Sequence, residues 1–224
     1  MVDIKTNLQQ LRKEIPENVE LVVVTKTRTN EEIMVAYNAG ERVFGENKVQ
    51  ELIAKQPQLP DDIQWHMIGH LQTNKVKYIA GWVSMIEAVD RMKLLRYINK
   101  EAKKHDRVIP CLLQFHIAEE ETKFGLSIEE AQEILNSDEF QKMEHVKICG
   151  VMGMATFTDD MEKVSREFRH LSNIFGQIKR QFFADDKGFR EISMGMSNDY
   201  KGALNEGTTM LRIGSTIFGP RPNA

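Results

Sequence analysis

Short apolar runs recur along the chain and alternate with segments whose apolar residues repeat with helical periodicity. Some runs, such as Leu21-Val22-Val23-Val24, are apolar throughout, which is typical of strands covered on both faces. The alternation predicts successive βαβ units and a parallel sheet. We expect eight strands, over Glu20–Thr25, Arg42–Gly45, Gln64–Ile68, Trp82–Ile86, Ile109–His116, Lys147–Gly153, Glu191–Met194 and Met210–Phe218.

The segments between these runs carry amphipathic stripes that predict helices packed on the sheet. We assign the stripes to core packing, because apolar residues at helical spacing serve that purpose far more often than ligand binding. The chain reaches Gly219-Pro220 directly after the expected eighth strand, so we expect no helix there, and we expect an N-terminal helix to cover the closing strands instead. The clearest stripes are Val164, Phe168, Leu171, Phe175, Ile178 and Phe182 and, before the first strand, Ile4, Leu8, Leu11 and Ile15.

Length and composition are consistent with an α/β protein made of one (β/α)8 barrel of the TIM type with an extra N-terminal helix. The chain has 224 residues, of which 41% are hydrophobic, and this is enough for one full core. No Ser/Gly linker or internal repeat divides it. We therefore predict a single domain over residues 1–224.

The net charge and the short length of the apolar runs argue against two classes of partner, nucleic acids and membranes. The 30 basic and 33 acidic residues leave a formal net charge of -3, which argues against nucleic acid, whose phosphates attract basic surfaces. The stretch from Val2 to Glu14 is polar and amphipathic, and no apolar run could span a bilayer. We predict a cytoplasmic protein that binds neither nucleic acid nor membranes, in which Cys111 and Cys149 are buried, reduced thiols.

Lys26 is the first candidate for chemistry, because it directly follows an apolar strand. Functional residues of such barrels lie at the carboxyl ends of the strands. Partial desolvation at that position would favour a neutral amine, which can attack an aldehyde. A surface lysine that opens a loop is the alternative.

Two loops near the C-terminus have the composition of a phosphate site. Barrels often bind phosphate with the loops after strands seven and eight. The loop over Ser193–Tyr200 contains Gly195 and Ser197, and the loop over Arg212–Thr216 contains Gly214 and two hydroxyls; glycine exposes backbone N–H groups, and hydroxyls add donors. Ordinary turns and helix caps have similar composition. The combination with Lys26 is more specific, because strands one, seven and eight are neighbours in a closed barrel.

Six motifs resemble those of the pyridoxal phosphate homeostasis protein family, whose barrel is similar to the N-terminal domain of alanine racemase. The Trp-His-x-Ile-Gly-His-Leu-Gln block at Trp65–Gln72 is the most specific of them. The resemblance covers nearly the whole chain and implies a fold-type III barrel that binds pyridoxal 5′-phosphate. The motifs are Val24–Thr27, Phe44–Asn47, Trp65–Lys75, Glu121–Gly125, Met194–Asp199 and Arg212–Gly219.

The resemblance also implies a role for individual residues. Lys26 would form the Schiff base, and the phosphate would be held by Ser197, Gly214 and either Ser215 or Thr216. Arg212 would face the pyridine nitrogen; because a guanidinium releases no proton, the ring would be a poorer electron sink. For three further sets of residues the alternatives stay open. Asn47 contacts the ring oxygen, orients Lys26 or forms a turn, and Met194 and Met196 pack near the ring or fill core gaps. Lys123 is either a second lysine for cofactor release or a loop lysine.

His66 and His70 raise the question of a metal site. Their interval spans a predicted strand end and a glycine, and spacing identifies no third ligand. We expect structural hydrogen bonds for both histidines and no metal.

Three functions fit a lysine with a phosphate site. The leading hypothesis is a monomeric binding protein that buffers and sequesters pyridoxal phosphate and delivers it to apoenzymes. A single-domain racemase or other amino-acid enzyme is the alternative, but alanine racemase-like enzymes place a second base on an additional β-domain for which this chain offers no sequence, and Lys26 would lack its partner. A Schiff-base aldolase acting on a phosphorylated sugar is less favoured, because no acid or second lysine is placed beside Lys26.

Overall fold

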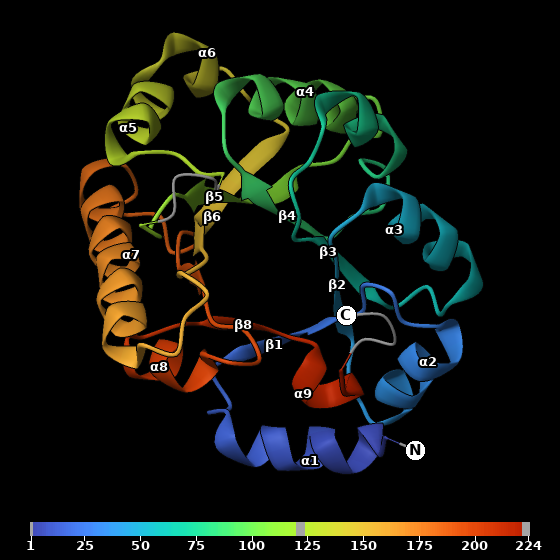
Figure 1. The fold of residues 1–224 in the computed structure, drawn as a ribbon. Helices are drawn as coiled ribbons and strands as arrows, with labels where there is room; N and C mark the ends of the chain where they lie inside the picture. Colours follow the sequence, from blue (N-terminus) through green and yellow to red (C-terminus); the bar gives the residue numbers. More distant parts are fainter. Residues whose placement is uncertain (1, 120–123, 221–224) are drawn as a thin grey trace.

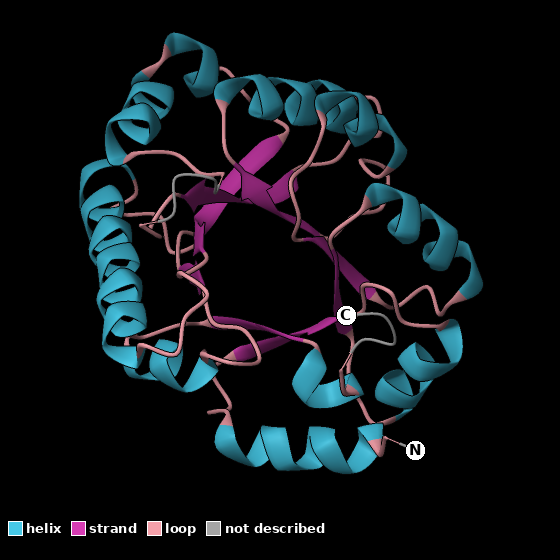
Figure 2. Cartoon of the chain, in the orientation of Figure 1, coloured by secondary structure: helices cyan, strands magenta, loops and turns pink. Residues whose placement is uncertain are grey.

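The computed structural model describes residues 2–119 and 124–220, and within them eight parallel strands close into a barrel (Figures 1 and 2). Each strand pairs with its neighbours in sequence order, and β1 also pairs with β8, so that Leu21 lies opposite Leu211 and Val23 opposite Ile213. The strands are β1 Glu20–Val24, β2 Val43–Glu46, β3 Gln64–Met67, β4 Met85–Val89, β5 Ile109–Phe115, β6 Val146–Gly153, β7 Glu191–Ser193 and β8 Met210–Ile213.

Helices surround the barrel on its outer side (Figure 1). Local signals fix where several begin. The side chains of Thr29 and Ser127 each accept a hydrogen bond from the backbone N–H three residues on, and the carboxylates of Glu32 and Glu130 accept one from the N–H of the cap residue, which completes two capping boxes. The helices are α1 Ile4–Glu14, α2 Asn30–Asn38, α3 Val49–Lys55, α4 Met92–Lys103, α5 Ile128–Asn136, α6 Asp138–Gln141, α7 Met161–Phe182, α8 Tyr200–Asn205 and α9 Ser215–Phe218, with 3-10 helices η1 Gln56–Gln58 and η2 Thr73–Tyr78.

The core forms two layers, because successive strand residues point to opposite faces. Side chains such as Leu21, Val23 and Phe44 pack outward against the helices. Val22, Val24 and Ile68 belong to a smaller cluster that fills the barrel interior. The interior packing leaves the carboxyl end of the strands to polar residues.

The N-terminal helix α1 packs beside the closing strands, as the sequence predicts. It buries Ile4, Leu8 and Leu11 and lies next to α9, outside β1 and β8 (Figure 1). The Asn7 amide donates a hydrogen bond to the Ile217 carbonyl at 3.0 Å. The predicted barrel with an extra N-terminal helix is therefore confirmed.

The predicted eighth strand, Met210–Phe218, is wrong in its second half. β8 ends at Ile213, and Ser215–Phe218 form the short helix α9. Ile217 and Phe218 are buried, and in the sequence their apolar character extends the strand pattern. Gly214 breaks the strand, and its carbonyl then accepts hydrogen bonds from the N–H groups of Ile217 and Phe218.

The fourth strand also differs from its prediction, Trp82–Ile86, because it spans Met85–Val89. The N–H groups of Trp82 and Val83 donate to the Ile79 carbonyl, so these residues close the turn after η2. In the sequence Glu87 interrupts the apolar run, and the predicted strand therefore ends before it. In the structure it lies fully buried inside the barrel, with partners on other strands.

No helix in the described part of the chain is both long and apolar enough to cross a membrane. Cys111 and Cys149 are both buried, as predicted, and no disulfide joins them.

Candidate functional site

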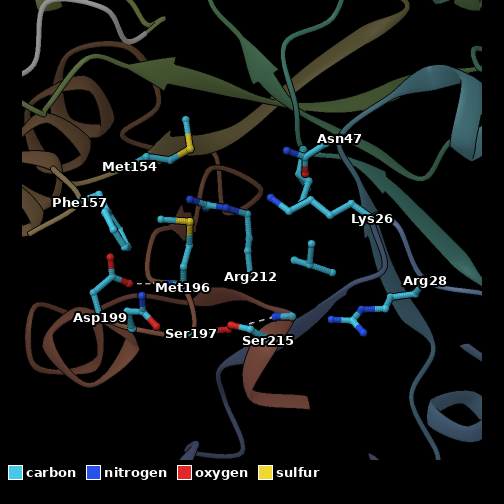
Figure 3. A pocket seen from close by; sticks show the side chains of 14 residues that line it. Lys26, Arg28, Asn47, Met154, Phe157, Met196, Ser197, Asp199, Arg212 and Ser215 are labelled. Atoms are coloured by element: carbon cyan, nitrogen blue, oxygen red, sulfur yellow. Dashed lines mark hydrogen bonds between the residues drawn. The ribbon is translucent and has the colours of Figure 1, made fainter. Parts of the chain in front are cut away.

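A cavity of about 320 Å³ opens at the carboxyl end of the strands. Residues from both ends of the sequence reach it, because β1 and β8 are neighbours in the closed barrel. Seven of the residues considered from the sequence line it, namely Lys26, Asn47, Met196, Ser197, Arg212, Gly214 and Ser215. Figure 3 shows Lys26, Asn47 and Arg212 close together, with Ser197 and Ser215 on one side of the cavity.

Lys26 lies two positions after Val24, the last residue of β1, and its side chain is half-buried and directed into the cavity (Figure 3). Thr25, the residue before it, is fully buried. Thr27, the residue after it, has a φ of 64°, in the left-handed region that β-branched residues rarely adopt. The turn after the strand is thus fixed on both sides of the lysine.

Arg212 is held by hydrogen bonds across the barrel interior. Its guanidinium donates to the Ser193 hydroxyl at 2.5 Å and to the Gly153 carbonyl at 2.9 Å. Ser193 donates in turn to Glu87 at 2.6 Å, and His66 Nδ1 lies 2.8 Å from the other oxygen of that carboxylate. These contacts orient the guanidinium toward the cavity.

The charge of Glu87 is stabilised by this network. Burial alone would raise its pKa, but the hydrogen bond to His66, the charges of His66 and Arg212 and the Ser193 hydroxyl favour the carboxylate, and the pKa lies below its ordinary value. Burial lowers the pKa of Arg212, against the attraction of Glu87 and Asp199. Glu87 therefore supplies the counter-charge that a buried guanidinium requires.

The loops after β7 and β8 meet at Ser197. Its hydroxyl oxygen accepts hydrogen bonds from the backbone N–H groups of Gly214 and Thr216, each at 3.3 Å. A Cβ at Gly214 would lie 3.1 Å from the Val24 carbonyl oxygen, so a side chain at that position would press on β1. The loops thus bring backbone donors together at the cavity wall, an arrangement that suits an anion.

Other predicted residues lie at different distances from the cavity. Met196 lines it, whereas Met194 is fully buried in the outer core and fills space there. Ser197, Gly214 and Thr216 form one hydrogen-bonded group, the Ser197 cluster, of which Thr216 is not among the residues lining the cavity. Asn47 lines the cavity, and its carbonyl packs so closely on Gly69 that a Cβ there would be 2.3 Å away. Lys123 lies outside the described residues.

The two histidines make hydrogen bonds, as expected from the sequence. His66 contacts Glu87, and His70 Nδ1 lies 3.0 Å from Asp90. The His70 ring also stacks on Phe124, with 4.1 Å between the ring centroids. Within residues 2–119 and 124–220, no group of three or more His, Cys, Asp or Glu side chains is arranged to hold a metal ion.

Sequence reasoning missed several residues that line the cavity. Arg28 lies two positions after Lys26 and donates to the carbonyls of Phe218 and Gly219, which anchors the end of α9. Phe157 lines the cavity although 81% of it is exposed. Both stand in loops without periodicity, and proximity to a strand end was the only available signal. The others are Val24, Ile68, Met154, Asn198 and Asp199.

Fold and site together define a class of protein: a parallel α/β barrel whose mouth combines an amine, a guanidinium and backbone donors for an anion. The family model of the alanine racemase N-terminal domain matches residues 2–222. The chain belongs to the pyridoxal phosphate homeostasis protein family, within the group that this domain model describes. The pyridoxal phosphate homeostasis protein of Aquifex aeolicus is 37% identical over 203 residues, which cover 90% of this chain and 87% of the relative. The one from Schizosaccharomyces pombe is 34% identical over 231 residues, 99% and 94% of the two chains.

Solved structures agree with this assignment. PipY of Synechococcus elongatus, solved with PLP bound, superposes with a TM-score of 0.87 at 31% identity and covers 97% of this chain and 100% of its own. An alanine racemase of Clostridium difficile superposes with a TM-score of 0.77 at 14% identity, and the match covers 99% of this chain and 60% of the racemase. The second likeness is one of fold.

Proposed function

We propose that this chain binds pyridoxal 5′-phosphate through a Schiff base on Lys26, and that it acts in the cytoplasm as a monomeric carrier. In this role it buffers and sequesters a reactive aldehyde and delivers it to apoenzymes. The observation that carries the proposal is that the Lys26 amine, the Arg212 guanidinium, Ser197 and Gly214 line one cavity. Relatives that are named for pyridoxal phosphate homeostasis support it.

The residues of the cavity fit the compound. When bound, pyridoxal phosphate supplies an aldehyde that condenses with an amine and releases one water molecule. Lys26 supplies the amine. The Ser197 hydroxyl and the N–H groups of Gly214 and Thr216 would hold the phosphate, because all three can donate to its oxygens.

Arg212 supports a carrier rather than an enzyme. Its contacts with Ser193 and the Gly153 carbonyl keep the guanidinium at the cavity wall. A guanidinium donates hydrogen bonds but releases no proton, so a ring nitrogen opposite it would stay unprotonated and withdraw electrons weakly. The site therefore favours holding the aldehyde over stabilising a carbanion.

The visible absorption spectrum after addition of pyridoxal phosphate tests the proposal. The wild type should show a Schiff-base band, and Lys26→Ala should lack it. Lys48→Ala is the matched control, because Lys48 is exposed one residue beyond Asn47, and it should keep the band. The absence of a band in the wild type would contradict the proposal and favour an aldolase. A band that persists in Lys26→Ala would show that another lysine forms the Schiff base.

Two further measurements separate a carrier from an enzyme and define its assembly. D- and L-alanine should be interconverted far below ordinary enzymatic rates of about 1 to 1,000 per second. Steady racemisation within that range would favour the single-domain racemase. Sedimentation equilibrium should give the mass of one chain, and a mass that rises with protein concentration would reject the monomer.

A further inference from the structure

A buried group of charges lies on the outer side of the strand end that carries Lys26. It consists of Glu46 at the end of β2, and Glu51 and Lys55 on α3. The Lys55 ammonium lies 2.6 Å from Glu46 and 3.3 Å from Glu51. Side-chain exposure is 0% for Glu46 and 10% for Lys55. Burying such charges costs free energy of folding unless every one of them has partners, so the groups that they contact indicate what they do.

These charges bind the peptide groups on both sides of Lys26. The Lys55 ammonium donates to the Thr25 carbonyl at 2.8 Å, which belongs to the peptide bond before Lys26. The Thr27 N–H, which belongs to the peptide bond after Lys26, donates to Glu51 at 2.8 Å. Because Glu51 and Lys55 also pair with each other, one ion pair holds both peptide planes.

Glu46 fixes the same turn from a third direction. The Thr25 hydroxyl donates to Glu46 Oε1 at 2.6 Å, and Lys55 donates to the same oxygen. The other oxygen of Glu46 is buried without a hydrogen-bond partner among the described residues. Burial therefore raises the pKa of Glu46, although Lys55 and Thr25 oppose this. An arrangement that leaves a carboxylate oxygen unsatisfied is expensive for stability, which suggests that it serves another purpose.

The turn needs such support. Thr27 is β-branched and has a φ of 64°, a conformation that persists only when surrounding contacts impose it. Without these contacts the peptide planes beside Lys26 could reorient through changes in φ and ψ, and the amine would move relative to Arg212 and Ser197. The proposed phosphate donors lie after β7 (Ser197) and after β8 (Gly214 and Thr216), and they make none of these contacts.

We propose that Lys55, Glu51 and Glu46 are positioning residues that aim the Lys26 amine at the aldehyde of the bound compound. This inference rests on the proposed function and extends it to a set of residues that touch neither ring nor phosphate. The inference divides ligand binding into two parts. Lys55, Glu51 and Glu46 control formation of the covalent link, and the Ser197 cluster controls retention of the phosphate.

Two ligands distinguish these parts. Pyridoxal 5′-phosphate engages both, whereas pyridoxine 5′-phosphate has the same ring and phosphate but an alcohol in place of the aldehyde and cannot condense with an amine. Affinity for each is measured by titration on the full chain. Glu51→Ala removes the acceptor of the Thr27 N–H at a partly exposed position, and Glu51→Gln restores an acceptor oxygen without charge. Lys55→Met is combined with Glu46→Gln, so that no buried charge is left unpaired.

We expect Glu51→Ala and the double variant to bind pyridoxal phosphate about tenfold more weakly, as for the loss of one hydrogen bond to a charged group. Their affinity for pyridoxine phosphate should not change. Glu51→Gln should recover most of the lost affinity, and Gln50→Ala, an exposed neighbour on α3, should behave as the wild type.

Equal losses for both ligands, or no loss for either, would overturn the positioning role. If the wild type forms no borohydride-stable adduct on Lys26, both this inference and the proposed function fail. A wild type that forms the adduct while the variants lose both ligands in parallel contradicts the inference alone. Circular dichroism of each variant verifies that the barrel is folded.

Discussion

Glu87 shows how one side chain can connect stability with the site. It is fully buried and contacts His66 and Ser193, and through Ser193 it reaches the guanidinium of Arg212. A glutamate within an apolar run gives little indication of such a role in the sequence. Its partners come from β3, β7 and β8, so only the closed barrel brings them together.

Glu87→Gln should lower the free energy of unfolding by about 3 kcal/mol near neutral pH, because Arg212 would lose its buried counter-charge. The pKa of Glu87 is lowered in the folded state, so its contribution is present above the unfolded pKa of about 4.3 and is lost as pH falls through the folded pKa. Urea unfolding as a function of pH should therefore show a smaller acid loss in the variant. The exposed Glu133→Gln is the control, and equal acid loss in Glu87→Gln and the wild type would contradict this role.

Ser197→Ala should weaken retention of pyridoxal phosphate while leaving the shape of its Schiff-base spectrum unchanged. The substitution removes a hydroxyl from the phosphate donors and does not touch Lys26. Affinity for pyridoxal, which lacks the phosphate, should not change. Dialysis of the loaded proteins measures retention, and equal retention in wild type and variant would reject the phosphate assignment.

For single residues, the sequence predicted membership of the site best where a residue follows a strand. Lys26 and Ser197 could be selected because the carboxyl ends of parallel strands converge, whereas Arg212 lies within β8 and its role came from the family resemblance. Met194 was placed among the candidates for the site, yet it faces the core, and Met196 lines the cavity instead. Side-chain direction beyond a strand end depends on the turn, here on Gly195 with a φ of 94°, and periodicity does not predict it.

The short helices α8 and α9 follow the two loops that meet at Ser197. Helix α1 contacts both of these helices through hydrogen bonds. Asn7 binds the Ile217 carbonyl in α9, and Glu14 accepts a hydrogen bond from the Tyr200 hydroxyl in α8. The stripe of α1 was readable from the sequence. The existence of α9 was not, because Ile217 and Phe218 extend an apolar strand pattern and only tertiary packing on α1 decides between strand and helix.

Leu8→Ala should lower the free energy of unfolding by about 3 kcal/mol, because Leu8 is 2% exposed in the interface of α1 with the barrel. Gln10→Ala, on the exposed face of the same helix, should change it by less than about 0.5 kcal/mol. Urea unfolding measures both. Similar effects for the two variants would show that α1 is not packed as described.

The closed barrel relates residues that are far apart in the chain. β1 and β8 pair directly, so Lys26 and Arg212 share a cavity although most of the sequence separates them. Strand order could be predicted because parallel βαβ units follow a regular connection rule. The cavity walls made by Arg28 and Phe157 could not, because loop conformations depend on contacts that no local pattern encodes.

Ligand binding should stabilise the whole molecule, since a compound that binds only the folded state shifts the unfolding equilibrium. Pyridoxal phosphate at about a hundredfold excess over its dissociation constant should add about 2.7 kcal/mol. At the same concentration Lys26→Ala should gain clearly less, because only the phosphate contacts remain. Thermal unfolding with and without ligand measures the difference, and equal stabilisation of both proteins would argue against a covalent link.

The most direct test of the central claim is borohydride reduction of the protein with bound pyridoxal phosphate, followed by peptide mapping. We predict one stable phosphopyridoxyl group per chain, on Lys26. A group fixed on another lysine, or none fixed at all, would contradict it.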